Sequence, residues 1–159
     1  MKLSSLALLG IFVVAGASPL RAQEDDKTMW RLTVEENEPR LDYGSNNAED
    51  TPIAFSCKAG KGSVAVWINE TSRGVKARRS MTASLTAGGT TSKVPGKTLP
   101  NEEAGTPSFS GSMKLSDPLF ATLGKEKSLV FVVGRSRDQV PLDDIGDKAD
   151  RFLRLCQKK

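Results

Sequence analysis

The chain lacks histidine, the side chain on which much acid–base and metal chemistry depends, among its 159 residues. This absence excludes Ser-His-Asp and Cys-His nucleophilic catalysis and any zinc or haem site with a histidine ligand. The two cysteines are too few for a four-cysteine zinc or iron–sulfur site. The sequence also has no P-loop and no Gly-x-Gly-x-x-Gly fingerprint after a strand. We therefore expect neither a metal nor a cofactor.

Carboxylates remain as possible catalytic groups, and they occur in three clusters. These are Glu35 to Glu38, Glu102 with Glu103, and Asp143 to Asp147. A glycosidase needs two carboxyl groups held across a cleft, whereas these clusters fall in predicted turns or at a helix start, where solvation and capping account for them. None has the spacing of a calcium-binding EF-hand loop. The sequence predicts a protein that is not an enzyme.

The first 22 residues have the pattern of a secretory signal peptide. Lys2 gives the positive start, and an uncharged apolar run over 6–17 leads to a small residue, Ala22. We expect cleavage between Ala22 and Gln23, with a cut after Ala17 as the alternative. A retained membrane anchor is the other possibility, but the apolar run is short for a bilayer. The prediction is a periplasmic or secreted protein whose residues 23–159 form one domain.

Two cysteines in an exported chain usually pair. Cys57 lies in the most strongly predicted hairpin and Cys156 lies close to the C-terminus. A Cys57–Cys156 disulfide would close most of the domain into one loop, and this is the expectation. The alternative is two free thiols.

The charge balance gives no reason to expect a nucleic-acid partner. Removal of Lys2 and Arg21 with the signal peptide lowers the formal net charge from +4 to +2. The densest basic stretches, 76–79 and 135–137, are short, as solvated surface charge usually is. We expect no nucleic acid and no integral membrane segment after cleavage.

Residues 53–69 show the clearest strand pattern in the chain. Ile53, Phe55 and Cys57 alternate with small residues, and the run from Val64 to Ile68 alternates again after a Gly-Lys-Gly turn. Further alternating runs follow the same rule. They predict strands at 30–34, 40–43, 77–87, 90–94 and 108–115, an apolar strand buried on both faces at 128–133, and a strand at 139–142.

Two helices complete the expected fold. Ser116 or Asp117 can cap a short helix over 118–123, and an apolar stripe with i, i+4, i+7 spacing predicts a C-terminal helix over 143–157. The fold class is therefore mainly β, an antiparallel β-sandwich or flattened barrel with one short helix and a C-terminal helix. A long loop rich in proline and glycine is expected at 95–107.

The order of these features resembles small periplasmic β-sandwich proteins of bacteria, and in particular the accessory family associated with type VI secretion. The resemblance rests on a strand with Phe55-Ser-Cys57, the alternating strand 64–68 and a closing helix with Phe152-Leu-Arg-Leu-Cys156. It covers roughly residues 30–157 in pattern. It implies an exported, secretion- or envelope-associated protein and transfers no active residue.

These observations favour a non-enzymatic protein that binds another periplasmic or envelope protein. The alternative is a resemblance to inhibitors of c-type lysozyme, which insert a Ser-Gly-x-x-Tyr loop into the enzyme's cleft. The matching residues here are Ser110, Gly111 and Lys114, with lysine where that family has tyrosine. We expect these three residues in a partner-binding loop.

Overall fold

The computed structural model describes residues 27–45, 51–69, 71 and 74–158. The predicted signal peptide, 1–22, and its cleavage site lie outside the described residues. Among the helices of the described part, none is both long and apolar enough to cross a membrane.

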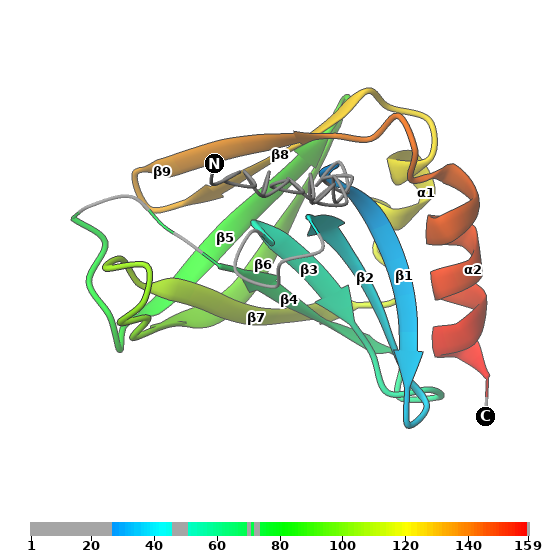
Figure 1. The fold of residues 1–159 in the computed structure, drawn as a ribbon, viewed down its shortest axis with the longest axis horizontal. Helices are drawn as coiled ribbons and strands as arrows, with labels where there is room; N and C mark the ends of the chain where they lie inside the picture. Colours follow the sequence, from blue (N-terminus) through cyan, green and yellow to red (C-terminus); the bar gives the residue numbers. More distant parts are fainter. Residues whose placement is uncertain (1–26, 46–50, 70, 72–73, 159) are drawn as a thin grey trace, which may run out of the picture.

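One antiparallel sheet makes up most of the described chain, and it curls into a half-barrel (Figure 1). Its nine strands lie in the order β1-β2-β3-β4-β7-β6-β5-β8-β9. The fold is mainly β, as predicted, and it is the curled-sheet form of the two architectures rather than a pair of stacked sheets. The strands are β1 (Met29–Glu35), β2 (Glu38–Gly44), β3 (Ile53–Ser56), β4 (Ser63–Ile68), β5 (Ser80–Ala87), β6 (Thr90–Leu99), β7 (Ser108–Lys114), β8 (Ser128–Val133) and β9 (Ser136–Pro141).

The predicted central hairpin is present as β3 and β4, which pair from Ile53 opposite Ile68 to Ser56 opposite Ala65. Gly60 and Gly62 in its turn have φ angles of 75° and 68°, a region that glycine enters without steric cost. The β1–β2 hairpin turns more tightly, through Glu36 and Asn37 alone, with φ angles of 46° and 68°. Two positive φ angles at the centre of a two-residue turn indicate the type I′ geometry that matches strand twist.

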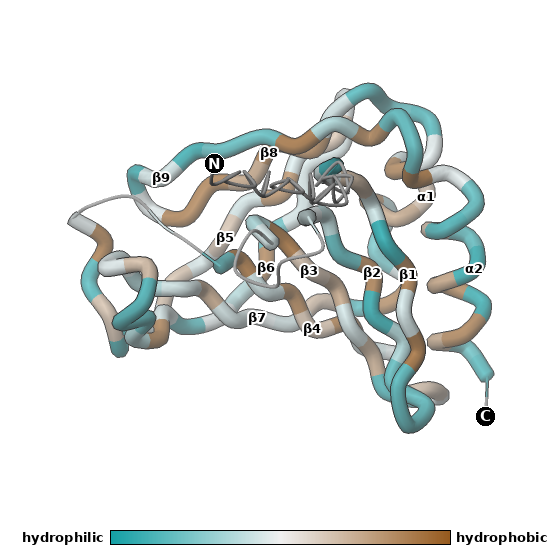
Figure 2. The backbone as a smooth tube through the Cα atoms, in the orientation of Figure 1, coloured by the Kyte–Doolittle hydropathy of each residue, from teal (hydrophilic) through white to brown (hydrophobic). Residues whose placement is uncertain are grey.

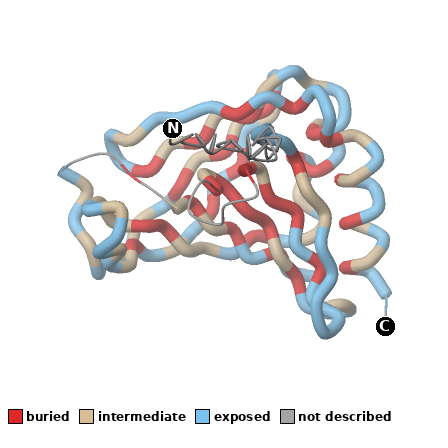
Figure 3. The backbone as a smooth tube through the Cα atoms, viewed as in Figure 1, coloured by how far each residue is buried: buried red, intermediate tan, exposed pale blue. Residues whose placement is uncertain are grey.

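Alternation along the strands separates a buried inner face from a more exposed outer face (Figure 3). Trp30 is fully buried on the inner face, whereas Trp67 is only half-buried on the outer face. The prediction that residues 128–133 are buried on both faces is wrong. Leu129 and Phe131 are buried, while Val130 is half-buried between them. The physical reason is that all strands of the described residues belong to this one sheet, so that none of them is stacked on its outside.

Both predicted helices are present and fill the inner side. The short helix α1 (Phe120–Leu123) follows Asp117, whose Oδ1 accepts the Leu119 amide at 3.0 Å. The C-terminal helix α2 (Gly146–Gln157) buries Ala149, Phe152 and Cys156 in the core. It begins three residues later than predicted because Asp144 lies in a turn, where its Oδ2 accepts the Trp30 amide at 3.2 Å.

The predicted disulfide between Cys57 and Cys156 is present, with the two Cα atoms 5.8 Å apart. It joins the end of β3 to the last turn of α2, and the Gly60 amide donates to the Cys156 carbonyl beside it at 2.8 Å. The C-terminal half of α2 is thereby fixed to the β3–β4 turn. A disulfide is consistent with an oxidising, exported location.

Candidate functional site at the β1 edge

The three residues expected in a partner-binding loop lie in the strand that the alternation over 108–115 also predicted, and they do not form a loop. Ser110, Gly111 and Lys114 belong to β7, which pairs with β4 on one side and β6 on the other. Gly111 lies opposite Gly96, and a Cβ atom added to Gly96 would lie 2.3 Å from the Ser110 carbonyl oxygen and 2.6 Å from the Phe109 ring. This glycine pair therefore makes room for Phe109 in the core. The glycine that looked like part of a loop has a packing role.

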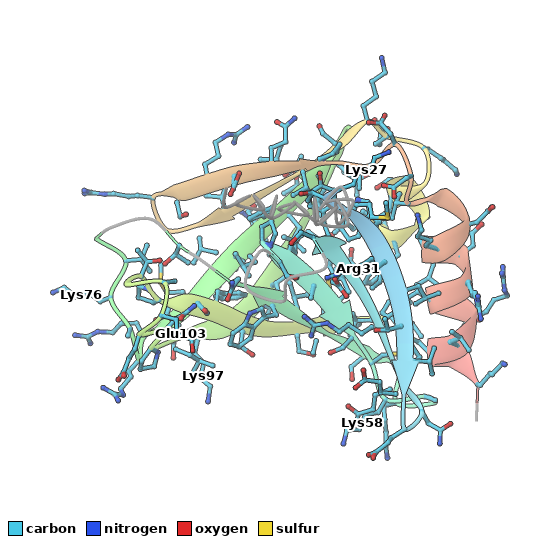
Figure 4. The ribbon with its side chains drawn as sticks, in the orientation of Figure 1. Lys27, Arg31, Lys58, Lys76, Lys97 and Glu103 are labelled. Carbon is cyan, nitrogen blue, oxygen red and sulfur yellow. A yellow bond between two sulfur atoms is a disulfide. The ribbon has the colours of Figure 1, made fainter. Side chains whose placement is uncertain are left out.

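The predicted 95–107 loop is shorter than expected, because β6 continues to Leu99. The remaining connection is held to its neighbours by hydrogen bonds. The Asn101 side-chain amide donates to the Ser108 hydroxyl at 3.0 Å, and the Thr71 hydroxyl donates to the Pro107 carbonyl at 2.7 Å. These contacts tie the connection to the ends of β4 and β7. Figure 4 shows Lys97 and Glu103 at this end of the molecule, with Lys76.

The carboxylate clusters of the sequence lie apart from one another in the fold. Glu35 to Glu38 surround the β1–β2 turn, where Glu38 forms an exposed ion pair with Lys58 at 3.1 Å. That turn borders an open hollow of about 780 Å³ on the outer face, lined by Thr33, Glu35, Glu36, Glu38, Arg40 and Ser56. Asp143 to Asp147 lie at the start of α2. Among the residues that the structure describes, no group of three or more histidine, cysteine, aspartate or glutamate side chains could hold a metal ion.

The two edges of the sheet, β1 and β9, offer a different kind of site. In an antiparallel hairpin with a two-residue turn, the two residues that flank the turn exchange backbone hydrogen bonds. Every second pair of opposite residues farther along the two strands does the same. The residues between these pairs direct their amide and carbonyl groups away from the partner strand. Such outward groups can bind an additional strand.

The β9 edge is closed to such pairing. Its outward positions are Arg137, Gln139 and Pro141, counted from the Gly134–Arg135 turn. The Gln139 amide donates to Asp138 Oδ1 at 2.7 Å, and Pro141 has no amide hydrogen. The Pro141 carbonyl accepts the Trp30 indole N–H at 2.7 Å. Most of β9 is also hydrophilic (Figure 2), which is typical of a protected edge.

The β1 edge is open over half of its length. Its outward positions are Trp30, Leu32 and Val34. Asp144 accepts the Trp30 amide, but the outward backbone groups of Leu32 and Val34 have no partner among the described residues. Both large hydrophobic side chains that are classed as exposed in the described chain lie on this strand, Met29 at 36% and Val34 at 48%. We call the outward positions Leu32 and Val34 the β1 edge.

A hollow of about 450 Å³ adjoins the β1 edge at its Val34 end. Three structural elements meet there, namely the β1–β2 hairpin, the β3–β4 turn and the end of α2. Its lining residues are Val34, Asn37, Pro39, Ala59, Leu155 and Lys158. We call this space the Val34 hollow, and its mostly apolar walls suit an apolar side chain.

The charged groups near β1 are arranged in two ways. On the outer face Asp42 is buried and bound by Arg31, whose Nη2 lies 2.5 Å from Asp42 Oδ2, and Arg31 Nη1 donates to the Ser45 carbonyl. This pair fixes the β1–β2 register. Figure 4 labels Arg31.

On the inner face burial raises the pKa of Tyr43, and the carboxylates of Asp144 and Asp143 raise it further. Tyr43 therefore stays neutral and packs against Trp30, with ring centroids 5.5 Å apart.

The sequence analysis did not identify the β1 edge as a site. The sequence nevertheless contains an indication of it, because the two segments that form the sheet edges differ in charge. Residues 29–34 carry one charge among apolar and polar side chains, whereas 135–141 carry Arg135, Arg137, Asp138 and a proline, as protected edges do. What was missing was the strand order, because only an edge strand needs such protection.

A comparison of the chain with protein-family models, with characterised proteins and with solved structures found no match.

Proposed function

We propose that this is an exported, non-enzymatic protein that binds another protein of the cell envelope by adding one of the partner's strands to its β1 edge. The observation that carries the proposal is the difference between the two sheet edges. The β9 edge is closed by Asp138, Pro141 and charged side chains, and the β1 edge leaves Leu32 and Val34 available. Natural proteins protect the edges that they do not use.

Strand addition suits this edge chemically. The partner's backbone would donate to and accept from the outward groups of Leu32 and Val34, and its alternate side chains would face the Val34 hollow. The disulfide supports the exported part of this proposal, since it is consistent with an oxidising compartment. The strand position of Ser110, Gly111 and Lys114 provides no projecting loop for a lysozyme cleft, so we do not propose inhibition.

The test uses a proline substitution at each edge as a matched pair. Val34→Pro removes an outward amide from β1, and Gln139→Pro removes an outward amide from β9, and neither amide bonds to the neighbouring strand. A photo-cross-linking residue replaces Glu35, which is exposed beside Val34. Irradiation of cells of the source organism should give an adduct with a second protein in the parent and in Gln139→Pro.

The same adduct should fall about tenfold or more in Val34→Pro, since a lost hydrogen bond and a blocked approach together exceed about 1.4 kcal/mol. Urea unfolding of both variants provides the control for folding. An adduct of equal yield in Val34→Pro would show that the β1 edge is not the binding surface. So would the lack of any adduct in the parent.

A further inference from the structure

The helix α2 presents one row of side chains on the side where the β1 edge lies open. Within α2, residues 148, 151 and 155 follow one another at the i, i+3 and i+7 spacing that places side chains on a single stripe, and we extend this row to Asp144 in the turn before the helix and to Lys158 just after its last residue. The first member, Asp144, bonds to the Trp30 amide at one end of β1. The last two, Leu155 and Lys158, line the Val34 hollow at the other end.

The row therefore runs beside the edge from Trp30 to Val34. The lengths are similar, because the 12 residues of α2 rise about 18 Å and the four steps along the strand from Trp30 to Val34 span about 13 Å. Arg151 lies between the two ends of the row. We call Arg151, Leu155 and Lys158 the α2 flank.

The α2 flank is positively charged. Asp144, the acidic member of the row, already binds Lys148 Nζ at 2.9 Å and the Trp30 amide at 3.2 Å. Arg151 and Lys158 are exposed, and neither forms an ion pair within the described residues. By the same 100° geometry Asp147 lies one turn before Arg151 and about 40° from it, whereas Arg154 and Asp150 lie about 60° and 100° from Arg151, on the side away from Lys148 and Leu155.

We propose that the β1 edge binds an extended segment that is both apolar and acidic, with an apolar side chain in the Val34 hollow and a carboxylate facing Arg151 and Lys158. This inference rests on the proposed function and adds to it the chemistry of the partner. The backbone of the segment pairs with Leu32 and Val34. Its inward side chains alternate, so that an apolar residue and an acidic residue two positions apart reach the hollow and the α2 flank together.

The charge complementarity favours this occupant over a second copy of the chain. In an antiparallel β1–β1 dimer the two α2 flanks would face each other, and Arg151 and Lys148 of one copy would lie near the same cations of the other. Like charges brought together in this way oppose association. An acidic strand instead neutralises Arg151 and Lys158 at once.

Peptide selection tests the proposal with a defined probe. A phage-displayed library of random peptides is selected on the purified, disulfide-intact protein, and the enriched peptides are synthesised. We expect enriched sequences with acidic residues at alternate positions to apolar ones. Their binding, measured by calorimetry, should weaken about tenfold in Val34→Pro and remain unchanged in Gln139→Pro.

Charge reversal then separates the inference from the proposed function. The double variant Arg151→Glu/Lys158→Glu should lose about tenfold or more in affinity for the acidic peptides and regain binding to peptides whose acidic residues are changed to lysine. Arg135→Glu/Arg137→Glu makes the same change in net charge at the β9 hairpin and should bind the acidic peptides like the parent.

Three results would overturn the inference. One is enrichment of peptides without acidic residues, and a second is equal affinity in the charge-reversed variant. The third is a concentration-dependent dimer in sedimentation that Val34→Pro abolishes, since the occupant would then be a second copy. If either of the first two occurs while the cross-linked adduct at Glu35 still depends on Val34, the proposed function stands and only the chemistry of the partner is wrong. The third result overturns the proposed function as well when the adduct at Glu35 is a dimer of this chain.

Discussion

Removing the Cys57–Cys156 disulfide should destabilise the protein by about 3–5 kcal/mol without undoing its fold. The bridge joins positions 99 residues apart. In the chain-entropy model a closed loop of about 100 residues lowers the entropy of the unfolded chain by an amount equal to about 4.7 kcal/mol, and measured losses run from about 2 to 5 kcal/mol. Burial of both half-cystines, at 5% and 1% exposure, adds to the loss when alanine replaces them.

The native fold should survive because other contacts hold α2. Ile145 and Phe152 are fully buried in the core, and the Asp144–Trp30 hydrogen bond fixes the start of the helix. The assay is urea unfolding of the Cys57→Ala/Cys156→Ala variant, followed by the fluorescence of the two tryptophans. The dependence of the unfolding free energy on urea should also steepen, since an unlinked chain exposes more surface when it unfolds.

Wild-type protein in strong reductant should lose most of the same stability but less than the double-alanine variant, because it keeps both buried sulfur atoms. The difference between the two measures the effect of the substitutions themselves. If the oxidised and reduced proteins unfold with the same free energy, the reasoning fails. The bridge would then not lower the free energy of the folded chain relative to that of the unfolded chain. A loss of α-helical circular dichroism in reduced but undenatured protein would refute the second half of the argument, that α2 is docked by its own packing.

Two further predictions follow from local geometry. Tyr43 is the one tyrosine of the chain, so tyrosinate absorbance titrates it directly. Burial first, and then Asp144 and Asp143, raise its pKa, so its contribution to stability is fully present below the ordinary tyrosine pKa of about 10 and is lost as the pH rises through the higher folded value. A midpoint in the folded protein at or below that of the urea-unfolded chain would contradict this. Gly96→Ala should cost about 1–3 kcal/mol in urea unfolding, since its Cβ would meet the Ser110 oxygen and the Phe109 ring. Gly89→Ala, with no atom within 4 Å, is the matched control and should change stability little, and equal effects of the two substitutions would show that the Gly96 contact is not limiting.

The features that the sequence predicted well are local ones. The β3–β4 hairpin follows from period-two alternation on either side of a glycine turn, and α1 follows from Asp117 before an apolar run. The disulfide could be predicted because a chain with two cysteines allows one internal pairing. In each case the residues that specify the feature lie in or beside it.

The features that the sequence missed depend on residues far apart in the chain. The alternation over 108–115 predicted a strand there, but the sequence also assigned Gly111 to a partner-binding loop. That assignment was wrong, because a glycine is required there by Gly96 on the neighbouring strand and by the Phe109 ring between them. The 128–133 strand was expected to be buried on both faces because its apolar run does not reveal that the sheet is single. Strand order decides both points, and pairs such as β4 with β7 join segments separated by two other strands.

The contacts that hold α2 also explain why the β1 edge can remain open without losing its shape. At one end of β1 the Trp30 amide binds Asp144 and the Trp30 indole binds the Pro141 carbonyl, which joins β1 to β9 and to the start of α2. At the other end the disulfide holds Cys156, and with it the last turn of the helix, to the end of β3. The α2 flank is therefore fixed at both of its ends beside Leu32 and Val34. A binding surface that is rigid before its partner arrives loses little conformational entropy on binding, so the ordering cost falls mainly on the incoming segment. Under the proposed function, this rigidity gives an edge with two available outward residues and one hollow a basis for selectivity, because its hydrogen-bonding groups, its apolar space and its two cations need no ordering before the segment binds.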